Sequence, residues 1–378
     1  MPLSPCILSV DELHNLSPPE RDTMRPVAER YPFRAPAPYL SRIDWQDPGD
    51  PLRRIVVPHP DELAPWGRPD PSDEAAYTRA PGLQHKYPST ALLLVTDNCA
   101  GYCRHCFRKR LFGEGRDEVA RDPRPALEYI REHREITNVL LTGGDPLTLP
   151  TRRLAAIVEQ VAQIPHVRAV RIGSKVPAYD PGRILRDPGL RDLVRATVRP
   201  DLRFFLMTQF NHPRELSREA LAAVHGLLAA GMTACNQTPL LRGVNDDPAV
   251  LARLFRSLTF AGISPYYVFV CRPTMGNLHL SVPVEECLAV FSTAQSRVSG
   301  LAKRARLVMS HATGKVEVVG VCRDKVVMRY HRAADPRMSG ELLMLPRNPA
   351  ARWLDDYLPA GEFFDDDPSC GFGCGSAA

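Results

Sequence analysis

The chain has 378 residues, of which 44% are hydrophobic and 24% are charged, a composition typical of a globular protein with one large or two ordinary domains. It contains no apolar run of roughly 18 residues that would predict a membrane span, and residues 1–16 lack the pattern of a signal peptide. The net charge of +5 is dispersed among 43 acidic residues, so we expect neither nucleic acid nor membrane as a partner.

Cysteine and proline usage adds two expectations. Ten cysteines in a chain long enough to build its own core favour a reducing, cytoplasmic location over a disulfide framework. The 37 prolines, many of them in residues 1–90 and 333–368, predict irregular segments and short helices at both ends.

Between these ends, apolar strand-like runs alternate with helical patterns. This alternation predicts parallel βα units, and six such units form a partial or full barrel whose active site lies at the carboxyl ends of the strands. We therefore predict an α/β fold, a partial (β/α)6 barrel (residues 86–300) with an irregular, partly helical N-terminal extension (1–85) and a C-terminal extension (301–378). The predicted strands are 91–96, 138–142, 167–172, 203–208, 232–235 and 266–270, and the predicted helices are 124–134, 151–163, 189–197, 216–230, 248–261 and 284–298.

Three cysteines follow the first predicted strand. Cys99, Cys103 and Cys106 have C-x3-C-x2-C spacing and are one ligand short of a closed structural zinc site. They suit a 4Fe–4S cluster in which thiolates hold three irons and the fourth iron is left free for chemistry. The alternative is a zinc knuckle or a set of unrelated core cysteines.

Polar motifs also follow the next three predicted strands. After the second strand come Gly143, Gly144 and Asp145, where two glycines let the backbone approach a ligand closely and a carboxylate can accept from an ammonium. Gly-Asp-Pro is also good turn chemistry, so an ordinary turn is the alternative. Residues 173–175 follow the third strand and residues 208–213 follow the fourth.

The cysteine spacing resembles the signature of radical S-adenosylmethionine (SAM) enzymes, and longer segments resemble the lysine 2,3-aminomutase family within that superfamily. The resemblance implies an isomerase that uses a 4Fe–4S cluster, SAM and pyridoxal 5′-phosphate (PLP). The free iron chelates SAM, one electron splits SAM to give a 5′-deoxyadenosyl radical, and PLP carries the substrate amine while nitrogen migrates from the α- to the β-carbon. The matching segments are residues 81–88, 92–110, 139–147, 164–177, 210–216, 236–247 and 265–269.

The resemblance assigns cofactor contacts to individual positions. It implies that Lys315 bonds PLP, whereas the alternative is a loop lysine before a strand, residues 316–321. Thr90 stands where lysine-specific members have arginine, which leaves the basic complement one charge short or requires another basic group. The other implied PLP contacts are Lys86, Gln237 and Thr238, and the implied SAM contacts are His105, Gly143, Gly144, Asp145, Ser174 and Gln209.

Substrate recognition is where the chain departs from lysine-specific members. Arg108 stands where the family has the arginine that grips the substrate α-carboxylate; the alternative is a solvated surface arginine. Arg272 and Val308 stand where lysine-specific members place two aspartates around the distal ammonium. An ammonium facing Arg272 would be repelled and unpaired at a cost of several kcal/mol, so we predict an acidic substrate, with glutamate as the natural candidate, unless Arg272 points elsewhere.

The C-terminal region departs as well. Lysine-type members end in a zinc site that uses one barrel cysteine, and here that barrel position is Asp247. Cys370 and Cys374 in the tail either bind a metal together with Cys287, Cys322 or a partner subunit, or stay unliganded; we favour no zinc. The stretch 329–357 has no counterpart in the lysine enzymes and either caps the barrel or packs on a neighbouring subunit.

The predicted function is therefore migration of the α-amino group of a free amino acid to its β-carbon. The expected partners are the amino acid, an electron donor such as flavodoxin or ferredoxin, and further copies of the chain in a homo-oligomer. Three alternatives remain at this point: modification of a protein-bound lysine, a larger secondary-metabolite substrate, and a scaffold that keeps the fold without catalysis.

Overall fold

The computed structural model describes residues 3–112 and 118–358. Its centre is a sheet of twelve strands in the order β14-β13-β12-β11-β10-β9-β8-β7-β6-β5-β4-β3. Strands β5 to β11 run parallel, and antiparallel strands extend both edges. The strands are β3 (Thr78–Ala80), β4 (Leu83–Tyr87), β5 (Thr90–Thr96), β6 (Asn138–Gly143), β7 (Ala169–Ser174), β8 (Arg203–Thr208), β9 (Thr233–Leu240), β10 (Ile263–Val270), β11 (Arg306–His311), β12 (Gly314–Cys322), β13 (Lys325–Ala333) and β14 (Leu342–Pro346).

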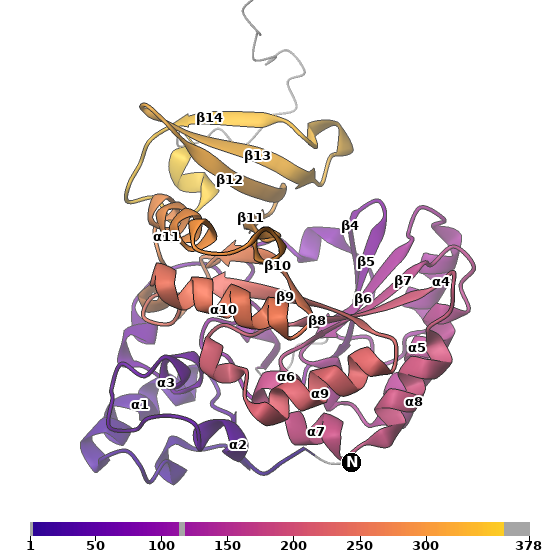
Figure 1. The fold of residues 1–378 in the computed structure, drawn as a ribbon, viewed down its shortest axis with the longest axis horizontal. Coiled ribbons are helices and arrows are strands. Elements are labelled where there is room, and N and C mark those ends of the chain that lie inside the picture. The colour runs from indigo at the N-terminus through magenta and orange to yellow at the C-terminus, as the bar shows by residue number, and fades with distance from the viewer. Residues whose placement is uncertain (1–2, 113–117, 359–378) are drawn as a thin grey trace, which may run out of the picture.

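Helices follow each of the six strands β5 to β10 and lie outside the curved sheet (Figure 1). This confirms the predicted partial (β/α)6 architecture. Strand β9 extends to Leu240 rather than to residue 235, because the polar residues 236–238 interrupt the apolar pattern although Asn236 and Thr238 are buried within the strand. The helices are α4 (Arg124–Glu132), α5 (Thr151–Ala162), α6 (Val176–Tyr179), α7 (Pro181–Leu185), α8 (Pro188–Thr197), α9 (Arg218–Ala229), α10 (Pro248–Phe260) and α11 (Val284–Ser296).

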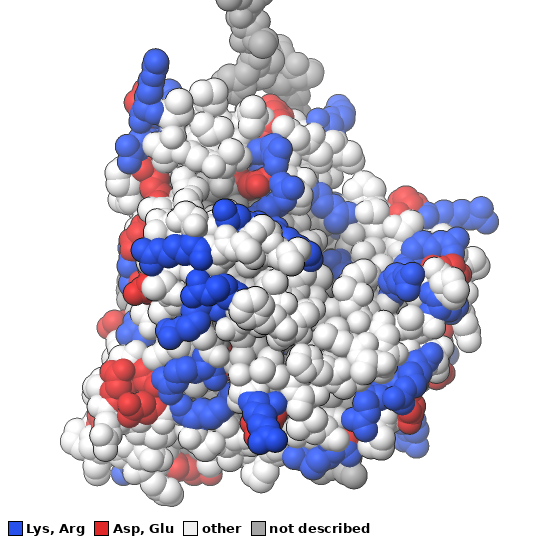
Figure 2. All heavy atoms as spheres, viewed as in Figure 1, with Lys and Arg blue, Asp and Glu red and all other residues white. Residues whose placement is uncertain are grey.

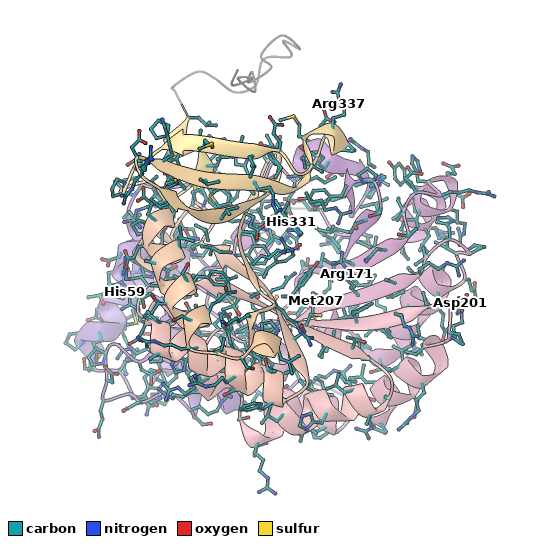
Figure 3. The ribbon with its side chains drawn as sticks, turned by 45° about the horizontal axis from the view of Figure 1, so that its top comes forward. His59, Arg171, Asp201, Met207, His331 and Arg337 are labelled. Carbon is teal, nitrogen blue, oxygen red and sulfur yellow. The ribbon has the colours of Figure 1, made fainter. Side chains whose placement is uncertain are left out.

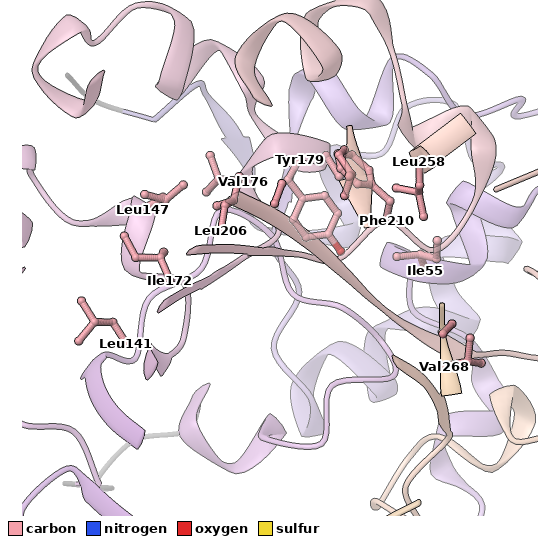
Figure 4. Packing of buried hydrophobic residues seen from close by; sticks show 14 of the residues in the cluster. Ile55, Leu141, Leu147, Ile172, Val176, Tyr179, Leu206, Phe210, Leu258 and Val268 are labelled. Atoms are coloured by element: carbon pink, nitrogen blue, oxygen red, sulfur yellow. The ribbon is translucent and has the colours of Figure 1, made fainter. Parts of the chain in front are cut away.

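The strands present an apolar face to the helices and a mixed face to the interior. Successive strand residues point to opposite faces, and Leu141 and Leu206 are fully buried in the apolar layer (Figure 4). Their neighbours Leu140 and Met207, together with Arg171, line a cavity on the other face. The barrel interior is therefore available for polar ligands.

The N-terminal extension is irregular with short helices, as predicted, and it supports the barrel from outside. The Tyr39 hydroxyl donates to the Glu215 carboxylate at 2.9 Å. Arg104, in the cysteine loop, donates to the buried Glu62 carboxylate at 2.7 and 2.8 Å. The extension comprises β1 (Cys6–Ile7), α1 (Pro18–Arg30), β2 (Ala35–Pro36), α2 (Ala37–Leu40) and α3 (Pro51–Val56).

The segments beyond the barrel are more regular than their proline content predicts. Strands β3, β4 and β14 fall in the proline-rich stretches, and the sheet continues across both predicted domain boundaries. Strands β12 to β14 form a layer at the top of Figure 1. After them, η10 (Leu354–Tyr357) packs back on the same chain, where Asp355 accepts from His311 Nε2 at 2.8 Å. The 329–357 stretch therefore extends and caps the barrel within one chain.

Among the described residues, no helix is both long and apolar enough to cross a membrane. Basic side chains are scattered among acidic ones over the face shown in Figure 2.

Candidate active site

The barrel holds a cavity of about 320 Å³ that is partly open to solvent. Figure 3 shows Arg171 and Met207 on its floor, beneath the layer of C-terminal strands that carries His331. Every residue predicted from the sequence to bind the cluster, a cofactor or the substrate lines this cavity except Thr238. Residues separated by more than 200 positions, such as Cys99 and Lys315, therefore meet in one space.

The three cysteines lie on the loop that follows β5. Cys99, Cys103 and Cys106 are half-buried and unbridged. Burial, together with repulsion among the three sulfurs, raises the pKa of the Cys99 thiol. The trio would therefore be neutral unless a cationic group held it as thiolates, which is what an iron–sulfur cluster does.

The arrangement of the trio fits a cluster better than a single ion. Within the described ranges, no group of three or more His, Cys, Asp or Glu side chains converges on one metal ion. A mononuclear zinc needs every sulfur about 2.3 Å from one point. The cysteines of a cubane each bind a different iron, so they do not need to converge in that way.

Gly143 and Gly144 fasten the end of β6 to the cysteine loop. A Cβ on Gly143 would lie 2.4 Å from the Thr96 carbonyl oxygen, and one on Gly144 would lie 2.3 Å from that of Asn98. The Gly144 and Asp145 amides donate to these same two carbonyls at 2.5 and 2.8 Å. The close approach that the glycines allow is thus to the loop that carries the cysteines, as well as to the cavity.

The Asp145 carboxylate is occupied by the protein itself. It accepts from the Ser174 hydroxyl at 3.0 Å and from the backbone amides of Leu147, Lys175 and Val176 at 2.7–3.0 Å. Asp145 and Ser174 therefore join the ends of β6 and β7. Because these contacts already use the carboxylate oxygens, this geometry does not support a role for the Asp145 side chain in accepting from a ligand ammonium. The backbone of residues 143–145 still lines the cavity and remains available to a ligand.

His105 and Gln209 approach each other across the cavity from the cysteine loop and the end of β8. The Gln209 side-chain amide donates to His105 Nε2 at 2.8 Å. His105 Nδ1 is buried without a protein partner. A buried donor without a partner at a cavity wall is a site for a ligand oxygen or sulfur.

Arg108 is held by an acid that the sequence analysis did not identify. Arg108 Nε and one terminal nitrogen donate to Glu74 at 2.6–3.1 Å, and the other terminal nitrogen donates to Thr142 Oγ1 at 3.0 Å. Arg110 also donates to Glu74 at 2.6 Å. Burial opposes ionisation of Glu74, but the two guanidinium groups outweigh it and hold the pKa of Glu74 at about 2.

Glu74 precedes η3 (Ala75–Tyr77) in a proline-rich segment. No periodicity distinguishes it in the sequence from the neighbouring Asp70 and Asp73. Only the fold brings it to the cysteine loop.

Lys315 is the second residue of β12, so it lies in a strand and not in a loop before one. Its Nζ donates weakly to Ser310 Oγ at 3.4 Å and lies 5.1 Å from the Phe269 ring centroid. Burial, reinforced by Arg272 and Lys86, lowers the pKa of Lys315 well below its usual value. A neutral amine in a cavity is a competent nucleophile toward a carbonyl.

The other predicted PLP contacts divide into two that face the cavity and one that does not. Lys86 donates to the His311 carbonyl at 2.6 Å, and burial and Arg272 lower its pKa to about 7. Gln237 lines the cavity, but Thr238, the next residue of β9, points to the opposite face. The Thr238 hydroxyl donates to the Phe210 carbonyl at 3.3 Å. The sequence-based assignment of the Thr238 side chain to the cavity is therefore corrected by strand alternation.

Arg272 follows β10 and does face the cavity. Its guanidinium stacks on Phe107 with 3.6 Å between Cζ and the ring centroid. Burial lowers its pKa to about 10, so it stays cationic at neutral pH. Val308 is fully buried outside the cavity lining, and the two lining acids, Glu74 and Asp145, are both occupied within the described chain.

Three further basic residues of the cavity, Arg171, Lys175 and Arg332, were not among the predicted site residues. Lys175 donates to the Glu215 carboxylate at 2.7 Å. Arg171 lies on β7 with its Nε buried and without a protein partner. Arg332 lies on β13 and donates to Ser89 Oγ at 2.8 Å and Thr90 Oγ1 at 3.0 Å. Arg171 could have been identified from the sequence, because a charged residue within an otherwise buried strand suggests a side chain that faces a cavity. Arg332 required knowing that β13 folds over the barrel.

The candidate zinc ligands do not come together in the described residues. Asp247 caps α10 by accepting from the Ala249 amide at 2.6 Å. Cys287 is buried and Cys322 is exposed on the β12–β13 hairpin. The prediction about Cys370 and Cys374 lies outside the described residues.

Comparisons with known proteins point to one kind of chemistry. Residues 93–255 match the radical SAM superfamily. The chain is 50% identical over 352 residues to a putative L-lysine 2,3-aminomutase of Aquifex aeolicus, covering 93% of this chain and 94% of that protein. It is 36% identical to the L-lysine 2,3-aminomutase of Clostridium subterminale, covering 77% of this chain and 71% of that one. It is 32% identical to the glutamate 2,3-aminomutase of Clostridioides difficile, covering 79% and 71%.

Proposed function

Because the chain belongs to the lysine 2,3-aminomutase family of radical SAM enzymes, we propose that it moves the α-amino group of a free acidic amino acid, glutamate or a close relative, to the β-carbon. As a radical SAM aminomutase the chain is an isomerase. Membership implies a 4Fe–4S cluster, SAM and PLP as its cofactors.

The observation that supports an acidic substrate is the positive charge of the side chains that line the cavity. The lining acids Glu74 and Asp145 are already occupied, so no lining carboxylate among the described residues is free to neutralise a substrate ammonium. Among the basic lining residues, Arg108 and Lys175 are paired with Glu74 and Glu215, and burial lowers the pKa of Lys315 well below its usual value. The basic lining residues without an acidic partner within the described chain are Lys86, Arg171, Arg272 and Arg332. A second carboxylate on the substrate would be attracted here, whereas a distal ammonium would be buried among like charges.

The cofactors supply the bond-breaking chemistry and the protein supplies position and charge. When bound, the cluster and SAM supply a hydrogen-abstracting radical, and PLP supplies a carbonyl for the substrate amine and a ring that delocalises an unpaired electron. Cys99, Cys103 and Cys106 would hold the cluster, and His105, Gln209 and the backbone at residues 143–145 would surround SAM. Lys315 would present a neutral amine to PLP, with Lys86 and Gln237 beside it.

Arg108 is oriented to bind the α-carboxylate. Glu74 occupies the edge of the guanidinium formed by Nε and one terminal nitrogen. Each terminal nitrogen keeps one further N–H, and together these form a second edge that suits a bidentate carboxylate. Thr142 fixes the rotation of that edge at 3.0 Å.

Arg272 is the candidate reader of the substrate side chain. It lacks an acidic partner among the described residues, and its stacking on Phe107 fixes the guanidinium plane beside the cysteine loop. The ring also covers one face of the cation and shields it from water, so that a carboxylate would gain more from pairing with it. Mutation of Arg272 should therefore affect the side chain that is accepted more than the chemistry itself.

The proposal is tested by product analysis. Anaerobically reconstituted protein is incubated with SAM, PLP, a reductant and each common amino acid in turn, and β-amino acids are identified by mass spectrometry. We expect β-glutamate to be the main product and the K315A variant to give none. Turnover of lysine in preference to every acidic amino acid would refute the role of the cavity charge, and absence of PLP uptake would refute the aminomutase mechanism itself.

A further inference from the structure

The cavity contains a basic side chain, Arg332, that comes from outside the six-stranded barrel. It lies on β13, directly across from Lys315 in the β12–β13 register. Both side chains line the cavity. Two cations at directly opposed positions of an antiparallel pair would repel each other. Burial lowers the pKa of Lys315 well below its usual value, so the positive charge of this pair lies on Arg332.

Arg332 has no acidic partner among the described residues. Its guanidinium donates hydrogen bonds to the neutral hydroxyls of Ser89 and Thr90, at 2.8 and 3.0 Å. Its Cζ also lies 4.4 Å from the Tyr87 ring centroid. These contacts hold the guanidinium in place without neutralising it, so its charge remains available to a ligand.

The hairpin formed by β4 and β5 completes a cradle around this cation. It contributes Lys86, whose Nζ is fixed by the His311 carbonyl at 2.6 Å, and the hydroxyls of Ser89 and Thr90. The Arg332 guanidinium, the Lys86 amine and the Thr90 hydroxyl line the cavity here. The Thr90 hydroxyl accepts from Arg332 and keeps its own O–H to donate. These groups together offer several N–H and O–H donors and positive charge, which suits a phosphate dianion. Thr90 stands where lysine-specific members have arginine, so the cofactor site lacks one basic residue at this position. The guanidinium of Arg332, which comes from strand β13, lies beside Thr90 and contacts its hydroxyl.

We propose that Arg332, carried by the C-terminal strand β13, binds the phosphate of PLP together with Lys86 and so replaces the basic residue missing at position 90. This inference rests on the proposed PLP-dependent function. Arg332 acts as a cofactor-binding residue, and Ser89 and Thr90 act as positioning residues that hold its guanidinium. The C-terminal layer is then part of the cofactor site and not only a cap.

The test measures cofactor binding and not turnover. Full-length protein free of PLP is titrated with PLP and, separately, with pyridoxal, which has the same ring and aldehyde but no phosphate; binding is followed by equilibrium dialysis and by the visible absorption of the bound ring. We expect R332A to weaken PLP binding by roughly 10- to 100-fold, as for loss of a charge-assisted hydrogen bond, and to leave pyridoxal binding unchanged.

Two further variants separate a lost phosphate contact from a disturbed fold. K325A, at the far end of β13 beside the exposed Asp324, should bind PLP like the wild type. The double variant T90R/R332A restores a positive charge at the same place from strand β5 instead of β13. It should recover most of the PLP affinity that R332A loses.

Three outcomes would overturn the assignment. They are equal weakening of PLP and pyridoxal in R332A, no weakening of either, and a raised KM for the amino acid with unchanged PLP affinity. If wild-type protein binds no PLP at all, the proposed function fails first, and this result is distinct from PLP binding that does not depend on Arg332.

Discussion

Glu74 offers the sharpest test of how the site is built. It is 7% exposed, it pairs with Arg108 and Arg110 at 2.6 Å each, and these partners hold its pKa at about 2 against an ordinary value of 4.5. We predict that E74Q, which keeps the shape and removes the charge, destabilises the protein strongly at neutral pH and frees Arg108.

The magnitude follows from the pKa. A shift from 4.5 to about 2 corresponds to about 3 kcal/mol at 1.36 kcal/mol per pKa unit. Removal of one partner from a buried ion pair costs a similar amount, about 3–5 kcal/mol. Because the folded pKa is depressed, this stability is fully present above pH 4.5 and is lost as the pH falls toward 2.

Urea unfolding of cofactor-free protein, followed by circular dichroism, measures the effect. E20Q is the matched control, since interactions with Ser17 and Arg53 also lower the pKa of Glu20 to about 2, but its side chain is 42% exposed and solvent screens it. We expect E20Q to cost no more than about 1 kcal/mol. The reasoning would be refuted if E74Q and E20Q lost equal amounts of unfolding free energy. It would also be refuted if the difference in unfolding free energy between wild type and E74Q did not shrink below pH 4.5.

Three further predictions concern other parts of the site. Borohydride trapping of PLP should map to Lys315 and rise less steeply between pH 7 and pH 9 than the roughly tenfold per pH unit of an ordinary lysine, because burial lowers the pKa of this amine. R272A should raise KM for glutamate by roughly tenfold or more with a smaller change in kcat, and equal KM values would contradict the role of Arg272. G144A places a Cβ 2.3 Å from the Asn98 carbonyl and should lower the free energy of unfolding by about 2–3 kcal/mol, whereas G320A, with nothing within 4 Å, should change it by no more than about 0.5 kcal/mol.

The sequence was sufficient for the barrel because its signals are local. Buried parallel strands such as 91–96 are continuous apolar runs, and amphipathic helices between them have a clear period. The cysteine trio and the glycine pair could be assigned for the same reason, since each lies within a few residues on one loop. Lys315 required the resemblance to a family, because nothing local distinguishes it from a surface lysine.

The parts of the site that the sequence did not predict depend on contacts between residues far apart in the chain, which no local pattern encodes. Glu74 reaches Arg108 only because the N-terminal extension folds against the cysteine loop. Arg332 reaches Thr90 across 242 residues. Thr238 was misplaced because the assignment ignored the alternation of side chains along β9. The apolar run 316–321 indicated the strand that became β12, but β13, which carries Arg332, was not predicted. The apolar residues 326–328, separated from that run by a short polar segment, were a hairpin signal that would have indicated it.

The central claim is that a cationic cavity selects a substrate with an acidic side chain, and a competition experiment tests it most directly. Wild-type enzyme, reconstituted with cluster, PLP, SAM and reductant, is given equal concentrations of glutamate and lysine, and the ratio of β-glutamate to β-lysine is measured alongside that of R272D. We predict a large excess of β-glutamate from the wild type and a shift toward β-lysine in R272D, because reversing the charge at Arg272 offers an acid to the ammonium. An excess of β-lysine from the wild type would contradict the account.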